Sequence, residues 1–363
     1  MESGLEVELE EWRARMPGLG LAAYRGQQIF RALQQDGVSG WDQVRQLKPE
    51  DRQRLAAAFS IHWPSIAQRV RSEDGTIRYL LELSDGKRVE AVYLPDEEFD
   101  SDGKLLHKRT TFCVSSQVGC AVNCQFCLTA TLGLSRSLTA AEIVGQVQVL
   151  LREHGLRPGR GLDRVNLVFM GQGEPFLNYA NLVRALRVLT SDEGAGLAAR
   201  RITVSTSGIV DKIRRWGKEE FPRGRPRLAI SLNASHDEQR QRLMPLHHGQ
   251  GGMAGLLAAV REYPYQLREY ITFEYVLLAG VNDSDEDAAR VLELLRGVRA
   301  KVNLIAWNMG GGLPFSSPER ERVLAFQSRL VAGGVATYIR RPRGRDIYAA
   351  CGQLAAVGST GGC

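Results

Sequence analysis

The sequence predicts an α/β fold: a partial (β/α)6 barrel preceded by a small helical domain and a β-hairpin. The first observation is that, from about residue 110, short apolar runs recur roughly every 25 to 45 residues. The second is that stretches with helical spacing of apolar residues lie between these runs. Strand and helix in regular alternation are typical of parallel βαβ units with right-handed crossovers, of which about six or seven fit the chain. A partial or complete barrel is therefore favoured over an open sheet.

The barrel strands look buried on both faces, as strands of a parallel sheet do. Catalytic groups in such folds collect at the carboxyl ends of the strands. The predicted strands are Val165–Met170, Ile202–Ser205, Leu228–Leu232, Ile271–Leu278, Val302–Trp307 and Val335–Ile339. The predicted helices between them are Thr139–Leu151, Tyr179–Leu189, Asp285–Val298 and Pro318–Ala332.

The segments before the barrel have a different pattern. Residues 24–33 space apolar side chains at helical intervals, and Pro49 lies near the first turn of another short helix. Residues 77–83 alternate in polarity, and the turn Ser84-Asp-Gly-Lys87 leads into a second alternating run, which predicts a β-hairpin. The expected organisation is a helical RNA-binding accessory domain, a hairpin linker, the barrel and a flexible tail, at residues 1–65, 66–105, 106–354 and 355–363.

Charge and apolar content narrow the class of protein. The acidic start of the chain argues against a leader peptide, and no apolar run approaches the roughly 20 residues that span a bilayer, so we expect a cytoplasmic protein without a membrane. The net charge of +6 is modest, but basic residues cluster, which suits a polyanion or a solvated surface equally. The clusters are Arg200-Arg201, Lys212 to Arg215, Arg223 to Arg227, and Arg340 to Arg345.

The cysteines point to metal chemistry. Four of the six, from Cys113 to Cys127, lie within fifteen residues, and in a reducing compartment such density favours a metal or redox site over disulfides. Cys120, Cys124 and Cys127 follow the spacing C-x3-C-x2-C. Three thiolates on one loop suit a [4Fe–4S] cluster whose fourth iron has no protein ligand. Zinc, the alternative, usually needs a second pair of ligands, which the sequence does not offer.

This spacing, with Phe126 before the last cysteine, resembles the radical SAM superfamily, in which the open iron binds S-adenosylmethionine. The surrounding motifs are similar to those of the RlmN/Cfr family of RNA adenine methyltransferases, over about residues 20 to 354. They are Cys113-Val-Ser-Ser-Gln-Val-Gly-Cys120, Met170-Gly-Gln-Gly-Glu-Pro175, Val204-Ser-Thr-Ser-Gly208, Ser231-Leu-Asn233, Phe273-Glu-Tyr-Val276, Val281-Asn-Asp283, Val302-Asn-Leu-Ile305 and Gly344-Arg-Asp-Ile-Tyr-Ala-Ala-Cys351-Gly-Gln-Leu354.

The resemblance implies a set of cofactor contacts. Taken alone, Gly173-Glu174 fits a glycine-rich turn after a strand, and the serines and asparagines fit helix N-caps. Their match to the family's motifs implies that they bind S-adenosylmethionine at the strand ends. The implied contacts are Gly173, Glu174, Ser205, Ser231, Leu232, Asn233 and Asn308.

The resemblance also implies the catalytic residues. Cys351, which alone would be a small buried residue, is the implied methyl acceptor. One S-adenosylmethionine methylates its sulfur, and a second supplies the radical that activates this methyl for addition to adenine. Cys113 is implied to release the covalent RNA adduct by forming a disulfide with Cys351. Glu90 is the implied acceptor of the ring proton, and Cys113 is the alternative.

The expected activity is methylation of adenosine C2 in 23S rRNA, and in tRNA beside the anticodon, by a monomer that receives electrons from a donor such as flavodoxin. Three alternatives remain: the C8-methylating branch of the family, a radical SAM oxidoreductase or maturase, and a zinc-stabilised RNA-binding protein. Glu174-Pro175 favours the C2 branch. The chain departs from the family's pattern at Gln172, where many relatives have Met, at Asn308-Met-Gly, which lacks a proline, and at Leu246-His-His248.

Overall fold

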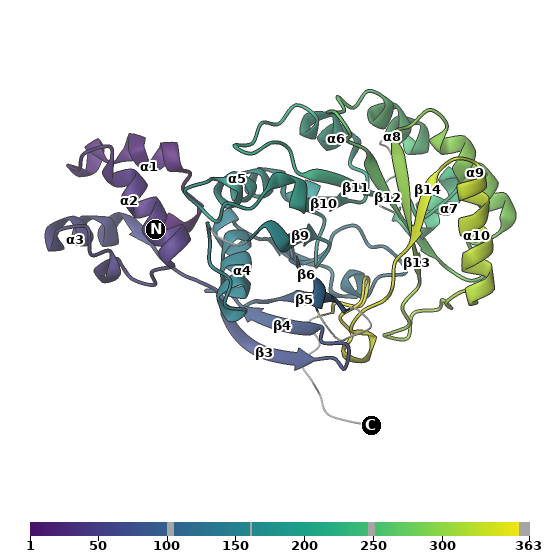
Figure 1. The fold of residues 1–363 in the computed structure, drawn as a ribbon, viewed down its shortest axis with the longest axis horizontal. Coiled ribbons are helices and arrows are strands. Elements are labelled where there is room, and N and C mark those ends of the chain that lie inside the picture. Colours follow the sequence, from purple (N-terminus) through teal and green to yellow (C-terminus); the bar gives the residue numbers. More distant parts are fainter. Residues whose placement is uncertain (100–104, 160–161, 246–250, 356–363) are drawn as a thin grey trace.

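The computed structural model describes residues 1–99, 105–159, 162–245 and 251–355. The predicted tail, with Cys363, and the segment Leu246-His-His248 lie outside these residues. The centre of the molecule is a ten-stranded sheet with the strand order β14-β13-β12-β11-β10-β9-β6-β5-β4-β3 (Figure 1). The two ends of this order do not pair with each other in the described part of the chain, so the barrel is open.

Seven neighbouring strands of this sheet run parallel. They are β6 (Leu105–Cys113), β9 (Val165–Phe169), β10 (Ile202–Thr206), β11 (Arg227–Ser231), β12 (Ile271–Leu277), β13 (Ala300–Ala306) and β14 (Ala336–Ile339). The helices that connect them lie outside the sheet (Figure 1). They are α4 (Ala140–Glu153), α5 (Tyr179–Thr190), α6 (Val210–Trp216), α7 (Asp237–Leu243), α8 (Gly252–Arg261), α9 (Asp285–Leu295) and α10 (Arg320–Ala332). The predicted partial α/β barrel is confirmed.

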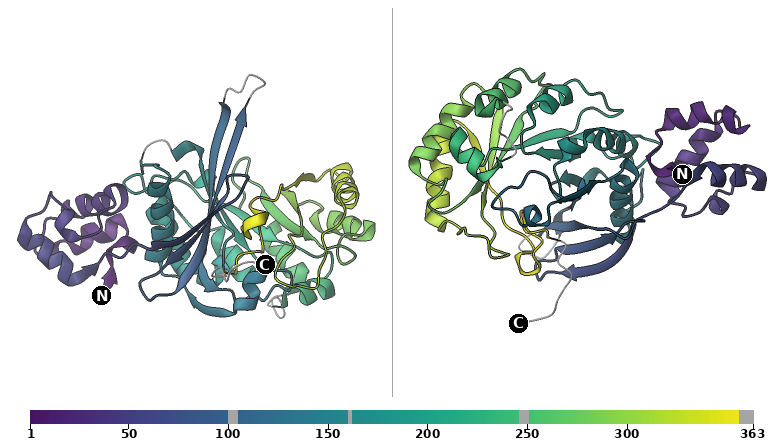
Figure 2. Two further views of the ribbon diagram at one scale, coloured as in Figure 1. Left: turned by 90° about the horizontal axis from the view of Figure 1, so that it is seen from below. Right: turned by 180° about the vertical axis from the view of Figure 1, so that it is seen from behind.

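Three antiparallel strands extend the sheet beyond β6: β3 (Ser65–Arg71), β4 (Ile77–Glu82) and β5 (Arg88–Phe99). The predicted hairpin corresponds to β4 and β5. It is therefore continuous with the barrel sheet. The sequence did not predict that β5 also pairs along its length with β6, forming a ribbon that projects from the body (blue, left view of Figure 2).

The N-terminal helices lie at one side of the barrel (Figure 1). They are α1 (Leu9–Arg15), α2 (Arg25–Arg31) and α3 (Pro49–Ala58), and the short strands β1 (Glu2–Ser3) and β2 (Phe59–Ser60) pair beside them. Trp12 and Phe30 are fully buried and belong to the same apolar core as α4 of the barrel. Because the core is continuous, the N-terminal helices are packed firmly against the barrel.

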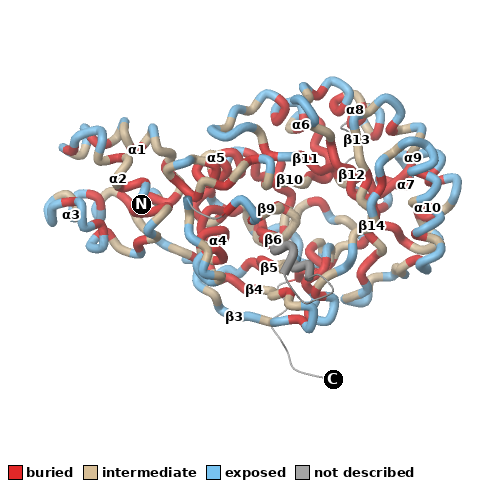
Figure 3. The backbone as a smooth tube through the Cα atoms, viewed as in Figure 1, coloured by how far each residue is buried: buried red, intermediate tan, exposed pale blue. Residues whose placement is uncertain are grey.

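Burial follows the predicted pattern of a parallel sheet. The strands at the centre are largely buried, whereas the outer faces of the helices are exposed (Figure 3). In β12, Phe273, Tyr275 and Leu277 all have no exposed surface. Among the described residues, no helix combines the length and apolar character of a membrane-spanning segment.

Candidate active site

Two adjoining cavities open at the carboxyl ends of the parallel strands. We call them the first and the second cavity. Ten residues singled out in the sequence line the first cavity, although they come from segments far apart in the chain. They are Cys120, Cys124, Cys127, Gly173, Glu174, Ser205, Ser231, Asn233, Asn308 and Cys351.

The three clustered cysteines lie on a loop whose backbone is held from several sides. The Cys127 amide donates to the Cys124 carbonyl at 3.1 Å, and the Cys120 amide donates to the Gly133 carbonyl at 2.9 Å. Asn123, between two of the cysteines, has a φ of 57°. This left-handed conformation is one that asparagine tolerates better than most residues. The loop is therefore a defined structure that directs three thiols into one cavity.

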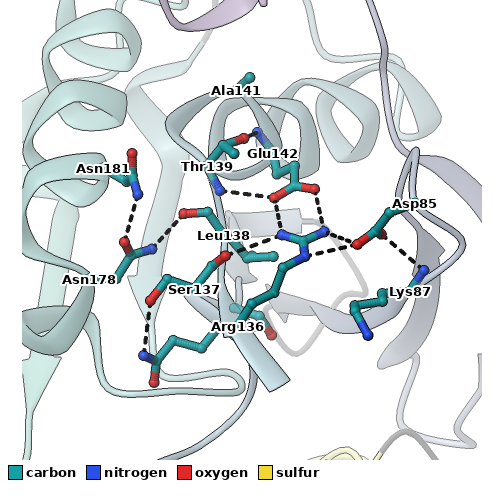
Figure 4. Close-up of polar contacts among 12 residues, drawn as sticks. Asp85, Lys87, Arg136, Ser137, Leu138, Thr139, Ala141, Glu142, Asn178 and Asn181 are labelled. Carbon is teal, nitrogen blue, oxygen red and sulfur yellow. Dashed lines mark hydrogen bonds and ion pairs between the residues drawn. The ribbon is translucent and has the colours of Figure 1, made fainter. Parts of the chain in front are cut away.

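The far side of this loop is anchored by strand β8 (Leu134–Ser137), which leads into α4 (Figure 4). The Arg136 guanidinium donates to both carboxylate oxygens of Glu142 at 2.8 Å and to Asp85 at 2.9 Å. These hydrogen bonds raise the pKa of Arg136, with the Glu142 bonds the main cause. Such a bidentate pair fixes geometry as well as adding energy, so the cysteine segment is fastened to both α4 and the β4–β5 turn.

The thiols of the loop favour a metal-bound state. Burial raises the pKa of Cys120 to about 12 and that of Cys124 well above its ordinary value, and the neighbouring thiols add to both shifts. A bound metal favours thiolate and so offsets this penalty.

The three thiols also supply a suitable set of ligands for an iron–sulfur cluster. Cys120, Cys124 and Cys127 come from one loop and line one cavity. They fit an iron–sulfur cluster, in which each thiolate ligates a different iron.

Glu174 is a buried carboxylate at the floor of the first cavity. Its Oε1 accepts from the Phe176 amide at 2.9 Å and its Oε2 accepts from the Ser207 amide at 2.6 Å. Burial raises the pKa of Glu174, and these hydrogen bonds oppose the shift. The carboxylate is thus held in one orientation beside the cysteines, where a ligand's amino group could donate to it.

The close packing of the Glu174 loop against Gln117 requires a glycine at position 173. Its φ of 95° is in the region that favours glycine, and a Cβ at this position would lie 2.5 Å from Gln117 Cβ. Any side chain would push the Glu174 loop away from strand β7 (Gln117–Gly119). The glycine therefore allows the backbone to approach both Gln117 and the cavity.

The predicted cofactor contacts at the ends of β10 and β11 differ in whether their side chains line the first cavity. Ser205 and Ser231 line it directly. Asn233 also lines it, and its Oδ1 accepts from the Val276 amide at 2.9 Å. Leu232 does not line the cavity: its side chain is fully buried in the apolar core.

Arg240, on α7, was not singled out in the sequence. It is almost fully buried and donates to three carbonyl oxygens at the strand ends: Ser231 at 3.0 Å, Leu232 at 2.6 Å and Ser207 at 2.5 Å. Burial lowers the pKa of Arg240 to about 10, so the group stays charged at neutral pH. No local motif marks this arginine, because its partners come from two other elements.

Cys351 lies where the two cavities meet. Both cavities are lined by Cys351, Asn308 and Arg340, but only the first by the clustered cysteines and only the second by Cys113. The Cys351 residue is exposed, and its carbonyl accepts from Asn308 Nδ2 at 3.2 Å. A thiol at this position can face ligands in either cavity.

Cys113 is buried at the end of β6, opposite Val92 of β5. Burial raises the pKa of its thiol to about 12, and the nearby Cys351 adds to the shift. The five described cysteines are all free thiols. The expected disulfide between Cys113 and Cys351 is therefore not a feature of this structure.

Arg340 connects the walls of the two cavities. It pairs with Glu274 at 3.3 Å, and Asn303 Nδ2 donates to the other Glu274 oxygen at 2.9 Å. Burial alone would lower the pKa of Arg340, but Glu274, Cys351 and Cys113 together raise it. In the sequence, Arg340 belongs to a basic cluster that suggested a charged surface. In the structure it lines both cavities.

Glu90 lines neither cavity. It is 1% exposed, pairs with Arg78 at 3.1 Å and accepts from Gln172 Nε2 at 3.1 Å. Its backbone carbonyl accepts from Ser115 Oγ at 2.6 Å. The structure thus brings Glu90 to the site end of β5 but holds its carboxylate within the protein.

The predicted basic clusters do not form one surface. In the α6 cluster, Arg214 pairs with Glu262 and Arg215 with Glu219, both at 3.1 Å. Arg200, Arg225 and Arg227 line a separate pocket at the amino ends of the strands. Only the run from Arg340 to Arg345 contributes to the two cavities: Arg340 lines both, and Arg341 and Arg343 line the second.

Comparison with known proteins agrees with this geometry. Residues 114–292 match the Radical SAM superfamily. The probable dual-specificity RNA methyltransferase RlmN of Koribacter versatilis (strain Ellin345) is 50% identical over 345 residues, which cover 93% of this chain and 97% of that protein. The dual-specificity RNA methyltransferase RlmN 2 of Myxococcus xanthus (strain DK1622) is 47% identical over 347 residues, 94% of this chain and 87% of that protein. The crystal structure of a radical SAM methyltransferase from Sphaerobacter thermophilus has a TM-score of 0.85 at 40% identity, covering 98% of this chain and 100% of that one.

Proposed function

This chain belongs to the RlmN family of radical SAM RNA methyltransferases, and we propose that it methylates C2 of an adenosine in 23S rRNA and in tRNA next to the anticodon. The observation that supports this proposal most directly is the junction of two cavities at Cys351. A thiol that borders both a cofactor cavity and a second cavity suits a carrier of the methyl group between them.

We propose that the first cavity holds the cofactors. When bound to Cys120, Cys124 and Cys127, a [4Fe–4S] cluster supplies the electron that cleaves S-adenosylmethionine to methionine and a 5′-deoxyadenosyl radical. Glu174 would accept from the amino group of the cofactor. The polar residues at the strand ends, Ser205, Ser231, Asn233 and Asn308, would orient its ribose, adenine and carboxylate.

Cys351 then has two proposed tasks in one turnover. Its sulfur first takes a methyl group from one S-adenosylmethionine and loses its proton. A radical from a second S-adenosylmethionine would then remove one hydrogen atom from that methyl, and the resulting carbon radical would add to C2 of adenine. The adduct would return one electron to the cluster and lose the ring proton, which leaves a thioether between Cys351 and the base. A methyl carried on the protein is needed because C2 of adenine is electron-poor and cannot attack a sulfonium methyl.

The second cavity would receive the flipped adenosine, and Cys113 would release the product. Cys113, as a thiolate, would attack the sulfur of Cys351; the bond from that sulfur to the added carbon would break, and that carbon would take up a proton to become the methyl group. The sulfur–sulfur bond formed would last only until cellular thiols reduce it. Cys113 lines this cavity, whereas Glu90 would have to leave Arg78 and Gln172 to reach it. This geometry favours Cys113 as acceptor of the ring proton, and its thiol would first have to lose its own proton.

The remaining partners follow from this chemistry. An electron donor such as flavodoxin would reduce the site, and a monomer in the cytoplasm would meet both RNAs. Arg341, which lines the second cavity, and the exposed Arg345 would contact phosphates.

The experiment is anaerobic incubation of the iron-reconstituted protein with S-adenosylmethionine, a reductant and an unmodified 23S rRNA fragment, followed by nucleoside mass spectrometry. We expect 2-methyladenosine, and none from the matched Cys351→Ala protein. Formation of 8-methyladenosine would show that the chain belongs to the C8-methylating branch of the family. Methylation by Cys351→Ala would contradict the cysteine carrier, and a wild type that acts on no RNA would overturn the proposed function.

A further inference from the structure

Tyr348 lies three residues before Cys351 in an unusual backbone conformation. Its φ of 53° and ψ of 39° are in the left-handed region, which costs a residue with a side chain roughly 1–2 kcal/mol. The conformation is held by its neighbours: the Ala349 amide donates to the Gly344 carbonyl at 2.8 Å, and Asp346 accepts from Ser72 Oγ at 2.6 Å. The turn therefore fixes the backbone from which the Tyr348 ring projects.

The Tyr348 ring packs against a neighbouring loop, and the residue also remains exposed. A Cβ on Gly310 would lie 3.2 Å from Tyr348 Cε1, so the absence of a side chain there lets the ring lie against the loop that follows Asn308. The same loop is tied to the turn, because Gln353 Nε2 donates to the Met309 carbonyl at 2.7 Å. Tyr348 nevertheless remains 49% exposed. An aromatic ring with this exposure and this support is a preformed contact surface.

The surroundings of Tyr348 indicate what would contact it. The next two residues, Ala349 and Ala350, line the second cavity, so the Tyr348 backbone lies directly beside it. Arg341 lines the same cavity, and the Arg345 carbonyl accepts from the Tyr348 amide at 3.3 Å. Both arginines are exposed, and neither forms an ion pair with a residue that the structure describes. An exposed aromatic ring flanked by unpaired cations is the combination that binds single-stranded nucleic acid, by stacking on bases and pairing with phosphates.

We propose that Tyr348 stacks on the RNA base next to the target adenosine. This inference rests on the proposed function. Extruding one adenosine into the second cavity leaves its neighbour without a stacking partner, at a cost of a few kcal/mol. A fixed tyrosine at the edge of the cavity replaces that partner and holds the flanking nucleotide in register with Cys351.

The test compares RNA binding by three variants. Tyr348→Asn removes the ring but suits the left-handed backbone, Tyr348→Phe keeps the ring, and Tyr338→Ala removes a tyrosine that is 57% exposed at the opposite end of the barrel. The probe is an rRNA fragment with 2-aminopurine beside the target adenosine. We expect Tyr348→Asn to weaken binding about tenfold and to abolish the quenching of 2-aminopurine, while Tyr348→Phe and Tyr338→Ala behave like the wild type.

Methylation of Cys351 in the absence of RNA reports on the intact turn and is measured for each variant. If Tyr348→Asn keeps this methylation and binds the probe as the wild type does, the inference is wrong while the proposed function stands. Equal weakening in Tyr348→Phe would also overturn it, since the hydroxyl and not the ring would be the contact. A wild type that methylates Cys351 but no RNA would instead overturn the proposed function.

Discussion

At the scale of single residues, Cys351 and Cys113 are a pair of thiols in contrasting environments. Cys351 is exposed at the junction of two cavities, whereas Cys113 is 8% exposed at the end of β6. Because burial disfavours the charged form, the pKa of Cys113 rises to about 12. At neutral pH Cys113 is therefore a protonated thiol, which is a poor nucleophile.

This contrast predicts selective alkylation. In metal-free protein at pH 8, iodoacetamide, which reacts with thiolates, should modify Cys351 and leave Cys113 unmodified. Modification of Cys113 should increase only as the pH approaches 12, since thiolate forms as pH rises through the pKa. Peptide mass spectrometry over a pH series measures both sites. Equal rates at the two cysteines at pH 8 would show that Cys113 is not shielded as described.

The candidate site residues were largely visible in the sequence, and the contacts that hold them in place were not. The spacing of Cys120, Cys124 and Cys127 predicts a cluster because all three lie on one loop. The pair formed by Arg340 and Glu274 joins residues from two strands, and no local pattern encodes such a contact. The burial of Glu90 between β4 and the Gln172 loop could not be read from sequence for the same reason.

At the scale of elements, the ends of β10 and β11 depend on a single side chain of α7. Arg240 donates to the carbonyls of Ser207, Ser231 and Leu232, which have the cavity residues Ser205 and Asn233 as close neighbours in sequence. Buried carbonyls left without a donor cost roughly 1–3 kcal/mol each. Through Arg240, α7 therefore stabilises the ends of β10 and β11 in addition to packing against the barrel.

We predict that Arg240→Met lowers the free energy of unfolding by about 3 kcal/mol, as measured by urea denaturation, and weakens binding of S-adenosylmethionine to the reconstituted protein. Arg242→Met is the matched control, because this arginine is exposed on the same helix and should change stability by less than about 0.5 kcal/mol. A similar small change for both variants would refute the role given to Arg240.

The barrel elements were predictable because each carries its own periodicity, and the predicted strand Ile271–Leu278 differs from β12 by one residue. The antiparallel extension was only half predicted. Alternation of polarity identifies β4 and β5 as strands, but it does not say that β3 pairs beside them or that β5 continues along β6. Pairing depends on distant segments, whose meeting the sequence pattern does not encode.

At the scale of the whole molecule, the topology accounts for the site. Parallel strands bring their carboxyl ends to one end of the barrel, so residues from Cys120 to Cys351 converge there although they are far apart in the chain. The parallel strand β6 places Cys113 in the wall of the second cavity, and the antiparallel strand β5 packs Val92 beside it. The N-terminal helices share the core at the side of the barrel.

The central claim is that Cys351 carries the methyl group from the first cavity to an RNA base in the second. The measurement is a labelling chase: the reconstituted protein is incubated with methyl-deuterated S-adenosylmethionine without RNA, washed, and then given unlabelled cofactor, reductant and RNA for a single turnover. The account predicts a trideuteromethyl group on Cys351 before the chase and 2-methyladenosine with two deuterium atoms after it. An unlabelled Cys351 together with fully unlabelled methyladenosine would contradict the account.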